Sequence, residues 1–225
     1  MCYNSSSSIV NYGYIMLLSI ILYIYGDNYD KHISLFSAVI VQLQLIEYFM
    51  WTDQKCGIVN KLATIIGRIL LFLQPLAILL GAYLFNTMNI SNNIMLIISV
   101  VYIVAWLLMN INYIGNKRYE ECSLSKDGHL QWSFMYGKTN IMDEIFVTIS
   151  NRIIYFVLML FSWLLFYNTS LGIFFSLLMT FILLIHYVQF PKYFQWATLW
   201  CFHTSIGFTI YAIVRYFDHK YNLFV

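Results

Sequence analysis

The chain has 225 residues, of which 61% are hydrophobic and 10% are charged, and its mean hydropathy is +0.71. Soluble domains carry about 25% charged residues, so the composition excludes an ordinary soluble protein and indicates an integral membrane protein. The formal net charge of +2, with no dense cluster of Lys and Arg, argues against nucleic acid as a partner.

Apolar runs long enough to cross a bilayer, roughly 20 residues each, recur along the chain. We expect seven spans, at about residues 9–25, 33–52, 62–85, 94–113, 144–167, 171–190 and 194–216, and one long polar loop at 114–143. The connections leave no room for a separate soluble domain. The sequence therefore predicts an all-α polytopic membrane helix bundle of about seven transmembrane helices, with residues 1–225 forming a single transmembrane domain in the lipid bilayer.

The long polar loop has two stretches of alternating residues around Lys126-Asp127-Gly128. This pattern is typical of a β-hairpin with a tight turn. One face of the hairpin would be aromatic, and we expect it, with His129 and Trp132, to lie over the mouth of the bundle as a lid. The alternative is an aromatic belt resting at the lipid headgroups.

Polar side chains inside the predicted spans gather in the half of the bilayer nearest the long loop, and an apolar plug is expected in the opposite half. Glu47 lies ~7 Å and Arg68 ~9 Å from the loop between their spans, at ~1.5 Å per residue, so we expect them to form an ion pair. Ionisable groups at such depth usually mark a pathway or a site. The candidate vestibule comprises Gln44, Glu47, Arg68, Arg152, His186 and His203.

The charge balance and the motifs restrict what this vestibule could do. One Glu against two Arg leaves a surplus positive charge, which favours an anionic solute over a cation. The sequence has no glycine-rich phosphate loop, nucleophile elbow, CxxC pair or HExxH, so an enzyme is not indicated. Glu47, His186 and His203 could supply three metal ligands, but no Asp lies in a predicted span, and we expect no metal and no cofactor. A proton pathway through the same three residues stays open, because His titrates near neutral pH.

Two observations on orientation disagree. The side with the amino terminus and the long loop carries seven Lys and Arg against three on the other side, which places the amino terminus in the cytoplasm. The sequons at Asn89 and Asn168 fall on the opposite side and agree with that placement. However, Cys56 and Cys122 lie in two loops on the supposedly cytoplasmic side, and a disulfide between them would require an oxidising space there. We expect the charge bias to decide.

The segments QLQLIEYFMW, with Glu47, and GHLQW, residues 128–132, resemble a group of uncharacterised seven-span membrane proteins encoded by large double-stranded DNA viruses. The abundance of Ile, Asn and Tyr is similar to that of proteins from AT-rich viral genomes. The resemblance implies a viral or host membrane location, and no site is transferred from it.

Three functions remain after these exclusions. The first is a protein that conducts or transports a small ion or anionic solute through the vestibule. The alternatives are a heptahelical ligand sensor and a structural component of a viral or cellular membrane. A homo-oligomer is compatible with each of them.

Overall fold

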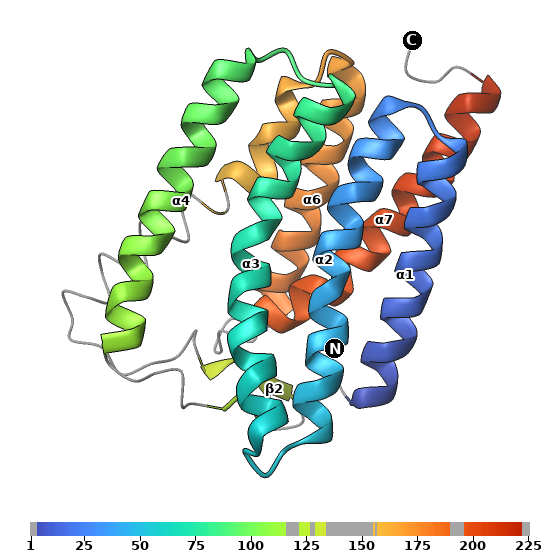
Figure 1. Cartoon of the computed structure of the whole chain (residues 1–225). Coiled ribbons are helices and arrows are strands. Elements are labelled where there is room, and N and C mark those ends of the chain that lie inside the picture. The colour runs from blue at the N-terminus through green and yellow to red at the C-terminus, as the bar shows by residue number, and fades with distance from the viewer. Residues whose placement is uncertain are drawn as a thin grey trace.

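The computed structural model describes residues 4–115, 122–126, 129–133, 155, 157–189 and 196–221, and it is mostly helical (Figure 1). The helices are α1 (Ser5–Tyr25), α2 (Asn28–Thr52), α3 (Ile58–Phe85), α4 (Asn92–Gly115), the 3₁₀ turn η3 (Ser162–Leu165), α6 (Thr169–Gln189) and α7 (Trp196–Tyr221). Two short strands, β1 (Leu124–Lys126) and β2 (His129–Gln131), lie between α4 and η3.

Three of the described helices, α1, α2 and α3, are long and apolar enough to cross a membrane, and shorter apolar helical stretches occur at Asn92–Leu108 and Thr169–Ile182. This supports a membrane protein. The number of seven spans stays a prediction, because half of the fifth predicted span, 144–167, lies outside the described residues.

The helix boundaries differ from the predicted ones at functionally important ends. α2 begins at Asn28 rather than near residue 33, because Asp27 and Asp30 form a capping box in which each carboxylate accepts the other residue's backbone N–H. α7 continues to Tyr221 rather than ending near residue 216. Both extensions add to the helices charged residues that the sequence analysis had placed in loops.

α2 is the central helix of the bundle, and it contacts α1, α3 and α7. Its Phe36 is fully buried and meets the Trp163 ring of η3 edge to face, with the ring centroids 4.8 Å apart. Trp163 in turn contacts Phe175 on α6 at 4.6 Å. This aromatic packing, of a geometry that adds to the effect of burial alone, joins α2 to the second half of the chain.

α2 and α3 approach closely at Gly81. A Cβ atom at this position would lie 2.1 Å from Cδ2 of His32, which is an impossible contact, so the glycine leaves the space that the imidazole occupies. His32 is fully buried, and its Nδ1 lies 2.7 Å from Oγ1 of Thr87, within hydrogen-bonding distance. The glycine therefore permits the close approach of α2 and α3 at this level.

The predicted β-hairpin is confirmed. β1 and β2 pair antiparallel, with Lys126 opposite His129. The side chain of Trp132, directly after β2, is 1% exposed and belongs to the hydrophobic core. Trp132 therefore packs into protein, and the role of the hairpin as a lid stays a prediction.

Candidate functional site

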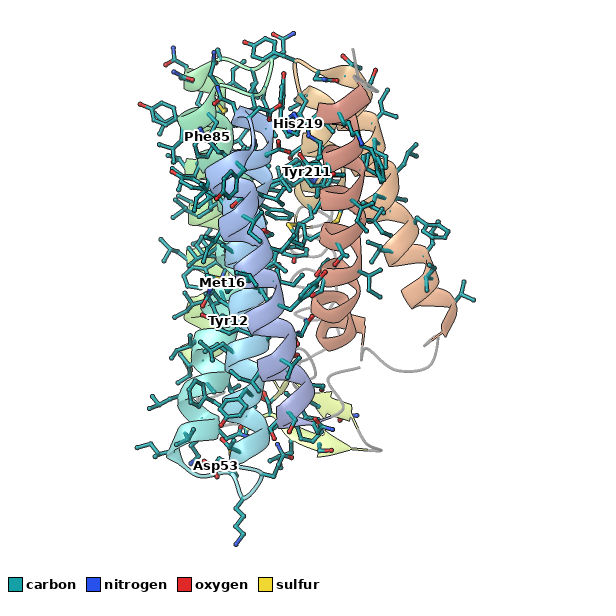
Figure 2. The ribbon with its side chains drawn as sticks, turned by 90° about the vertical axis from the view of Figure 1, so that its right-hand side faces the viewer. Tyr12, Met16, Asp53, Phe85, Tyr211 and His219 are labelled. Atoms are coloured by element: carbon teal, nitrogen blue, oxygen red, sulfur yellow. A yellow bond between two sulfur atoms is a disulfide. The ribbon has the colours of Figure 1, made fainter. Side chains whose placement is uncertain are left out.

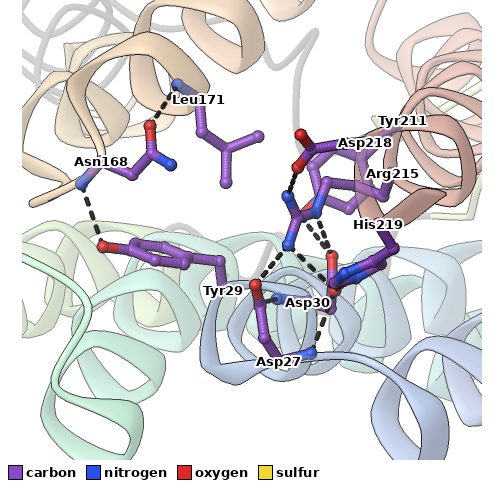
Figure 3. A network of polar contacts seen from close by, with 9 residues as sticks. All are labelled: Asp27, Tyr29, Asp30, Asn168, Leu171, Tyr211, Arg215, Asp218 and His219. Carbon is purple, nitrogen blue, oxygen red and sulfur yellow. Dashed lines mark hydrogen bonds and ion pairs between the residues drawn. The ribbon is translucent and has the colours of Figure 1, made fainter. Parts of the chain in front are cut away.

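A network of buried charges links the start of α2 to the last turns of α7 (Figure 3). Asp30 is at its centre and is fully buried. Oδ1 of Asp30 accepts hydrogen bonds from the Tyr211 hydroxyl at 2.8 Å and from Nε of Arg215 at 2.8 Å. Oδ2 lies 2.8 Å from Nε2 of His219, and it also accepts from Nη2 of Arg215 at 3.3 Å. Both oxygen atoms of the carboxylate are therefore within hydrogen-bonding distance of side-chain partners.

Arg215 is 3% exposed and distributes its guanidinium over three carboxylates. Besides Asp30, it forms ion pairs with Asp27 on the α1–α2 turn and with Asp218 one turn further along α7. The planar fork of an arginine suits such divided recognition. A buried guanidinium is stable only when it is paired and hydrogen-bonded in this way.

Local sequence accounts for this geometry. The capping box holds Asp27 and Asp30 at the start of α2, and the α1–α2 turn packs against them at Gly26, where a Cβ atom would lie 2.2 Å from Cβ of Asp30. On α7, five of the buried residues follow a spacing of four and three that keeps them on one face. These residues are Thr204, Phe208, Tyr211, Arg215 and Asp218.

The network carries three carboxylates and one guanidinium, so it has an acidic balance even when His219 is protonated. Asp27, Asp30 and His219 each have a potential metal ligand atom, and these atoms lie within 4.8 Å of one another. Arg215 already binds both of these carboxylates, so the guanidinium occupies the position that a cation would need. We therefore assign the group to an ion-pair network rather than to a metal centre.

A row of polar side chains continues from this network between α1, α2 and α7, and we call it the polar seam. Ser34 donates to the backbone carbonyl of Ser19 at 2.6 Å, and the hydroxyls of Ser19 and Ser37 are 2.5 Å apart. Further along α1, the Asn11 amide donates to the Ser205 hydroxyl of α7 at 2.8 Å. Figure 2 shows α1 in front of α2, with α7 beside them.

A second buried carboxylate lies near the other end of α2. Glu47 is fully buried, and the Gln44 amide donates to its Oε2 at 3.0 Å. Seventeen residues separate Glu47 from Asp30, which is ~25 Å along a helix. Asp30, Ser34, Ser37 and Gln44 are spaced by four, three and seven residues and share one face of α2.

The structure describes only part of the predicted vestibule. It places Gln44 and Glu47 together, and it places Arg68 on α3 with a half-buried side chain. The ion pair between Glu47 and Arg68 stays a prediction. Arg152 lies outside the described residues, as do the side chains of His186 on α6 and His203 on α7.

One prediction about the distribution of polar groups is wrong. The half of the bundle far from the long loop is not an apolar plug, because Asp30, Arg215 and Asp218 are buried there, as is His32. In Figure 2, Tyr211 and His219 lie at the end opposite to Asp53 of the α2–α3 loop. The statement that no Asp lies within a helical span also fails, since Asp30 belongs to α2. The spacing Asp27-x-x-Asp30 was the signal in the sequence that indicated the earlier helix start.

At the lid end, a disulfide joins Cys56 to Cys122, with the Cα atoms 5.5 Å apart. The pairing considered from the sequence is therefore present. Trp132 of the predicted lid is buried in the core, whereas the side chain of His129 is outside the described residues. The hairpin thus lies against the α2–α3 end of the bundle (Figure 1).

Comparison of the chain with protein-family models, with curated proteins and with solved structures found no match.

Proposed function

We propose that the protein conducts protons, or a small cation, across a membrane along the polar seam. The observation that carries this proposal is the pair of fully buried carboxylates, Asp30 and Glu47, at the two ends of one polar face of α2. Their separation of ~25 Å approaches the ~30 Å thickness of the hydrocarbon region. Buried ionisable residues in membrane helices are expensive and mark pathways by default.

The charges of the described residues favour a cation over the anion expected from the sequence. The surplus positive charge was inferred from one Glu and two Arg, without the residues at the far end of the bundle. Asp27, Asp30 and Asp218 surround a single Arg215, which reverses the balance at that end. An acidic site attracts protons and small cations and repels anions.

A hydrophobic stretch divides the seam and would act as its gate. Ile40 and Val41 lie on α2 between Ser37 and Gln44, and each is 1% exposed. Hydroxyl groups can relay protons directly, but two turns of apolar side chains require a transient entry of water. Apolar constrictions gate membrane pathways in this manner, by wetting and drying.

Flux into liposomes tests the proposal. The purified protein is reconstituted with an internal pH-sensitive dye, and a potassium gradient with valinomycin sets the membrane potential. We expect proton flux above that of empty vesicles, no chloride flux, and loss of proton flux in Glu47→Gln, which keeps the shape of the side chain but not its charge. A well-folded wild type that is silent for protons, small cations and chloride would support the structural alternative instead.

We further propose that the lid end, with the amino-terminal end of α1, faces an oxidising compartment, which reverses the orientation expected from the charge bias. The disulfide between Cys56 and Cys122 supports this, because such bonds persist in oxidising spaces. The charge bias is a statistical tendency, whereas a disulfide sets a chemical requirement on the compartment that it faces. The sequon at Asn168 lies at the other end of the bundle. The Asn168 side chain accepts a hydrogen bond from the Leu171 N–H and so caps α6, which gives this side chain a structural role.

Thiol labelling of intact cells distinguishes the two orientations. In a variant with Cys2→Ser and Cys201→Ser, a membrane-impermeant maleimide should label Cys122 only after treatment with a membrane-impermeant phosphine. Adding Cys56→Ser should make Cys122 reactive without reduction. Labelling of Cys122 that needs permeabilised cells would restore the cytoplasmic placement of the amino terminus.

A further inference from the structure

Two fastenings of different chemistry hold the β1–β2 hairpin against the α2–α3 end of the bundle. We propose that the redox state of the disulfide decides whether the hairpin can undock from the bundle. When the disulfide is formed, the hairpin stays docked. When the disulfide is reduced, hydrogen bonds around Asn60 hold the hairpin, and it undocks reversibly. This inference concerns the lid alone and does not depend on whether protons cross the seam.

The first fastening is the side chain of Asn60, which is fully buried at the start of α3. Its Oδ1 accepts the Ser123 N–H at 2.9 Å, and its Nδ2 donates to the Ser123 carbonyl at 2.8 Å. The amide side chain thus binds both backbone groups of Ser123, as a neighbouring strand would. Thr64 adds a hydrogen bond to the Ser123 hydroxyl at 2.9 Å.

Asn60 also ties this contact to the α2–α3 loop. Its Nδ2 lies 3.0 Å from the carbonyls of both Met50 and Asp53, and its backbone N–H donates to the Asp53 carboxylate at 3.0 Å. A buried amide with this many partners is costly to leave unsatisfied. The docked position of Ser123 is therefore the favoured one even without a covalent link.

The second fastening is the disulfide from Cys56 to Cys122, the residue before Ser123. Cys56 has a φ angle of 62°, a left-handed conformation that is uncommon for residues other than glycine. Glycine would suit the backbone better at this position, so what cysteine contributes there is the sulfur. The covalent link and the Asn60 contact act on adjacent residues of the same segment.

Undocking would expose apolar surface, because Leu130 is fully buried and Trp132 nearly so. The hairpin therefore undocks rarely, and the disulfide prevents it from undocking. When a dithiol donates two electrons and two protons, the S–S bond breaks to give two cysteine thiols and the dithiol becomes a disulfide. The hairpin is then held only by the Asn60 contacts and by the burial of its apolar side chains, and it samples the undocked state.

Amide hydrogen exchange followed by mass spectrometry of the full-length protein in nanodiscs tests this inference. The peptide that covers residues 122–133 is compared in oxidised and reduced wild type and in oxidised and reduced Asn60→Ala. We expect reduction of the wild type to speed exchange about tenfold or more, because a disulfide contributes at least the ~1.4 kcal/mol to which a tenfold ratio corresponds. Reduced Asn60→Ala should lose hairpin protection altogether, while oxidised Asn60→Ala should keep most of it.

Two matched variants serve as controls. Cys56→Gly removes the disulfide and suits the left-handed backbone, so it should exchange like the reduced wild type even though no reductant is added. Gln54→Ala removes the exposed hydrogen bond that Oε1 accepts from the Ser125 N–H, together with the bond from Nε2 to the Met50 carbonyl of α2, and it should leave the oxidised and reduced rates nearly unchanged. Equal exchange in all oxidised and reduced samples would overturn this inference, and so would complete loss of protection on reduction of the wild type alone, since Asn60 would then hold nothing.

Discussion

Replacing Asp30 by Ala lowers the free energy of unfolding by about 3–5 kcal/mol, the cost of removing one partner from a buried ion pair. Asp30 is fully buried, and its loss leaves Arg215 buried without its principal carboxylate. The Tyr211 hydroxyl loses its acceptor in the same step. The measurement is reversible unfolding of the purified protein in mixed micelles, followed by circular dichroism.

Two companion variants separate the network from a general effect of mutation. Asp27→Ala should cost only about 1–2 kcal/mol, because it removes the N-cap bond to the Asp30 N–H and an ion pair with Arg215 that is partly solvated, since the Asp27 side chain is 42% exposed. The double replacement Asp30→Leu with Arg215→Met should be less harmful than Asp30→Ala alone, since it removes both charges of the central pair and leaves no buried guanidinium. If Asp30→Ala unfolds within about 1 kcal/mol of the wild type, the assignment of Asp30 as the centre of the network is wrong.

Removing the two hydroxyls in the middle of the seam, with Ser19→Ala and Ser37→Ala together, should reduce proton flux at least about tenfold, which a barrier increase of ~1.4 kcal/mol would produce. The hydroxyls lie 2.5 Å apart between Asp30 and the apolar gate, and without them water must bridge a longer gap. Stability should fall by only about 1 kcal/mol. Ser99→Ala on α4 is the matched control, because its hydroxyl bonds only to the carbonyl of Met95 on its own helix.

Much of the architecture could be predicted because it follows from composition and local pattern. Low charge and repeated apolar runs indicate membrane helices, and alternation around Lys126 indicates a hairpin. The burial of Glu47 also follows from its place inside an apolar run. Each of these properties is set by neighbours in the sequence, so no knowledge of the three-dimensional arrangement is needed.

The main charge network could not be predicted in the same way, because its partners are far apart in the sequence. Asp30 and Arg215 are separated by 185 residues. Asp30 lies where hydropathy places a loop, and Arg215 lies at the very end of the last predicted span. Hydropathy cannot show that a helix continues through charged residues when those charges neutralise each other. The capping box at Asp27 and Asp30 was the local signal that α2 starts early, but nothing local to Asp30 identifies Arg215 as its partner.

The orientation shows how two valid physical arguments can conflict. The Lys and Arg count is a statistical tendency, and it favours the cytoplasm for the amino terminus. The disulfide between Cys56 and Cys122 places a chemical requirement on one end of the bundle. Only the structure could show that the two sulfur atoms meet, because the cysteines lie in separate loops.

The central claim is that the seam between Asp30 and Glu47 carries protons, and proton flux in proteoliposomes tests it most directly. The wild type and the Ser19→Ala, Ser37→Ala variant are reconstituted at equal density, and acidification is recorded with an internal dye under a fixed membrane potential. We predict clear flux for the wild type and at least about a tenfold lower rate for the variant. Equal rates for the two proteins, or a folded wild type that is no faster than empty vesicles, would contradict the proposed pathway.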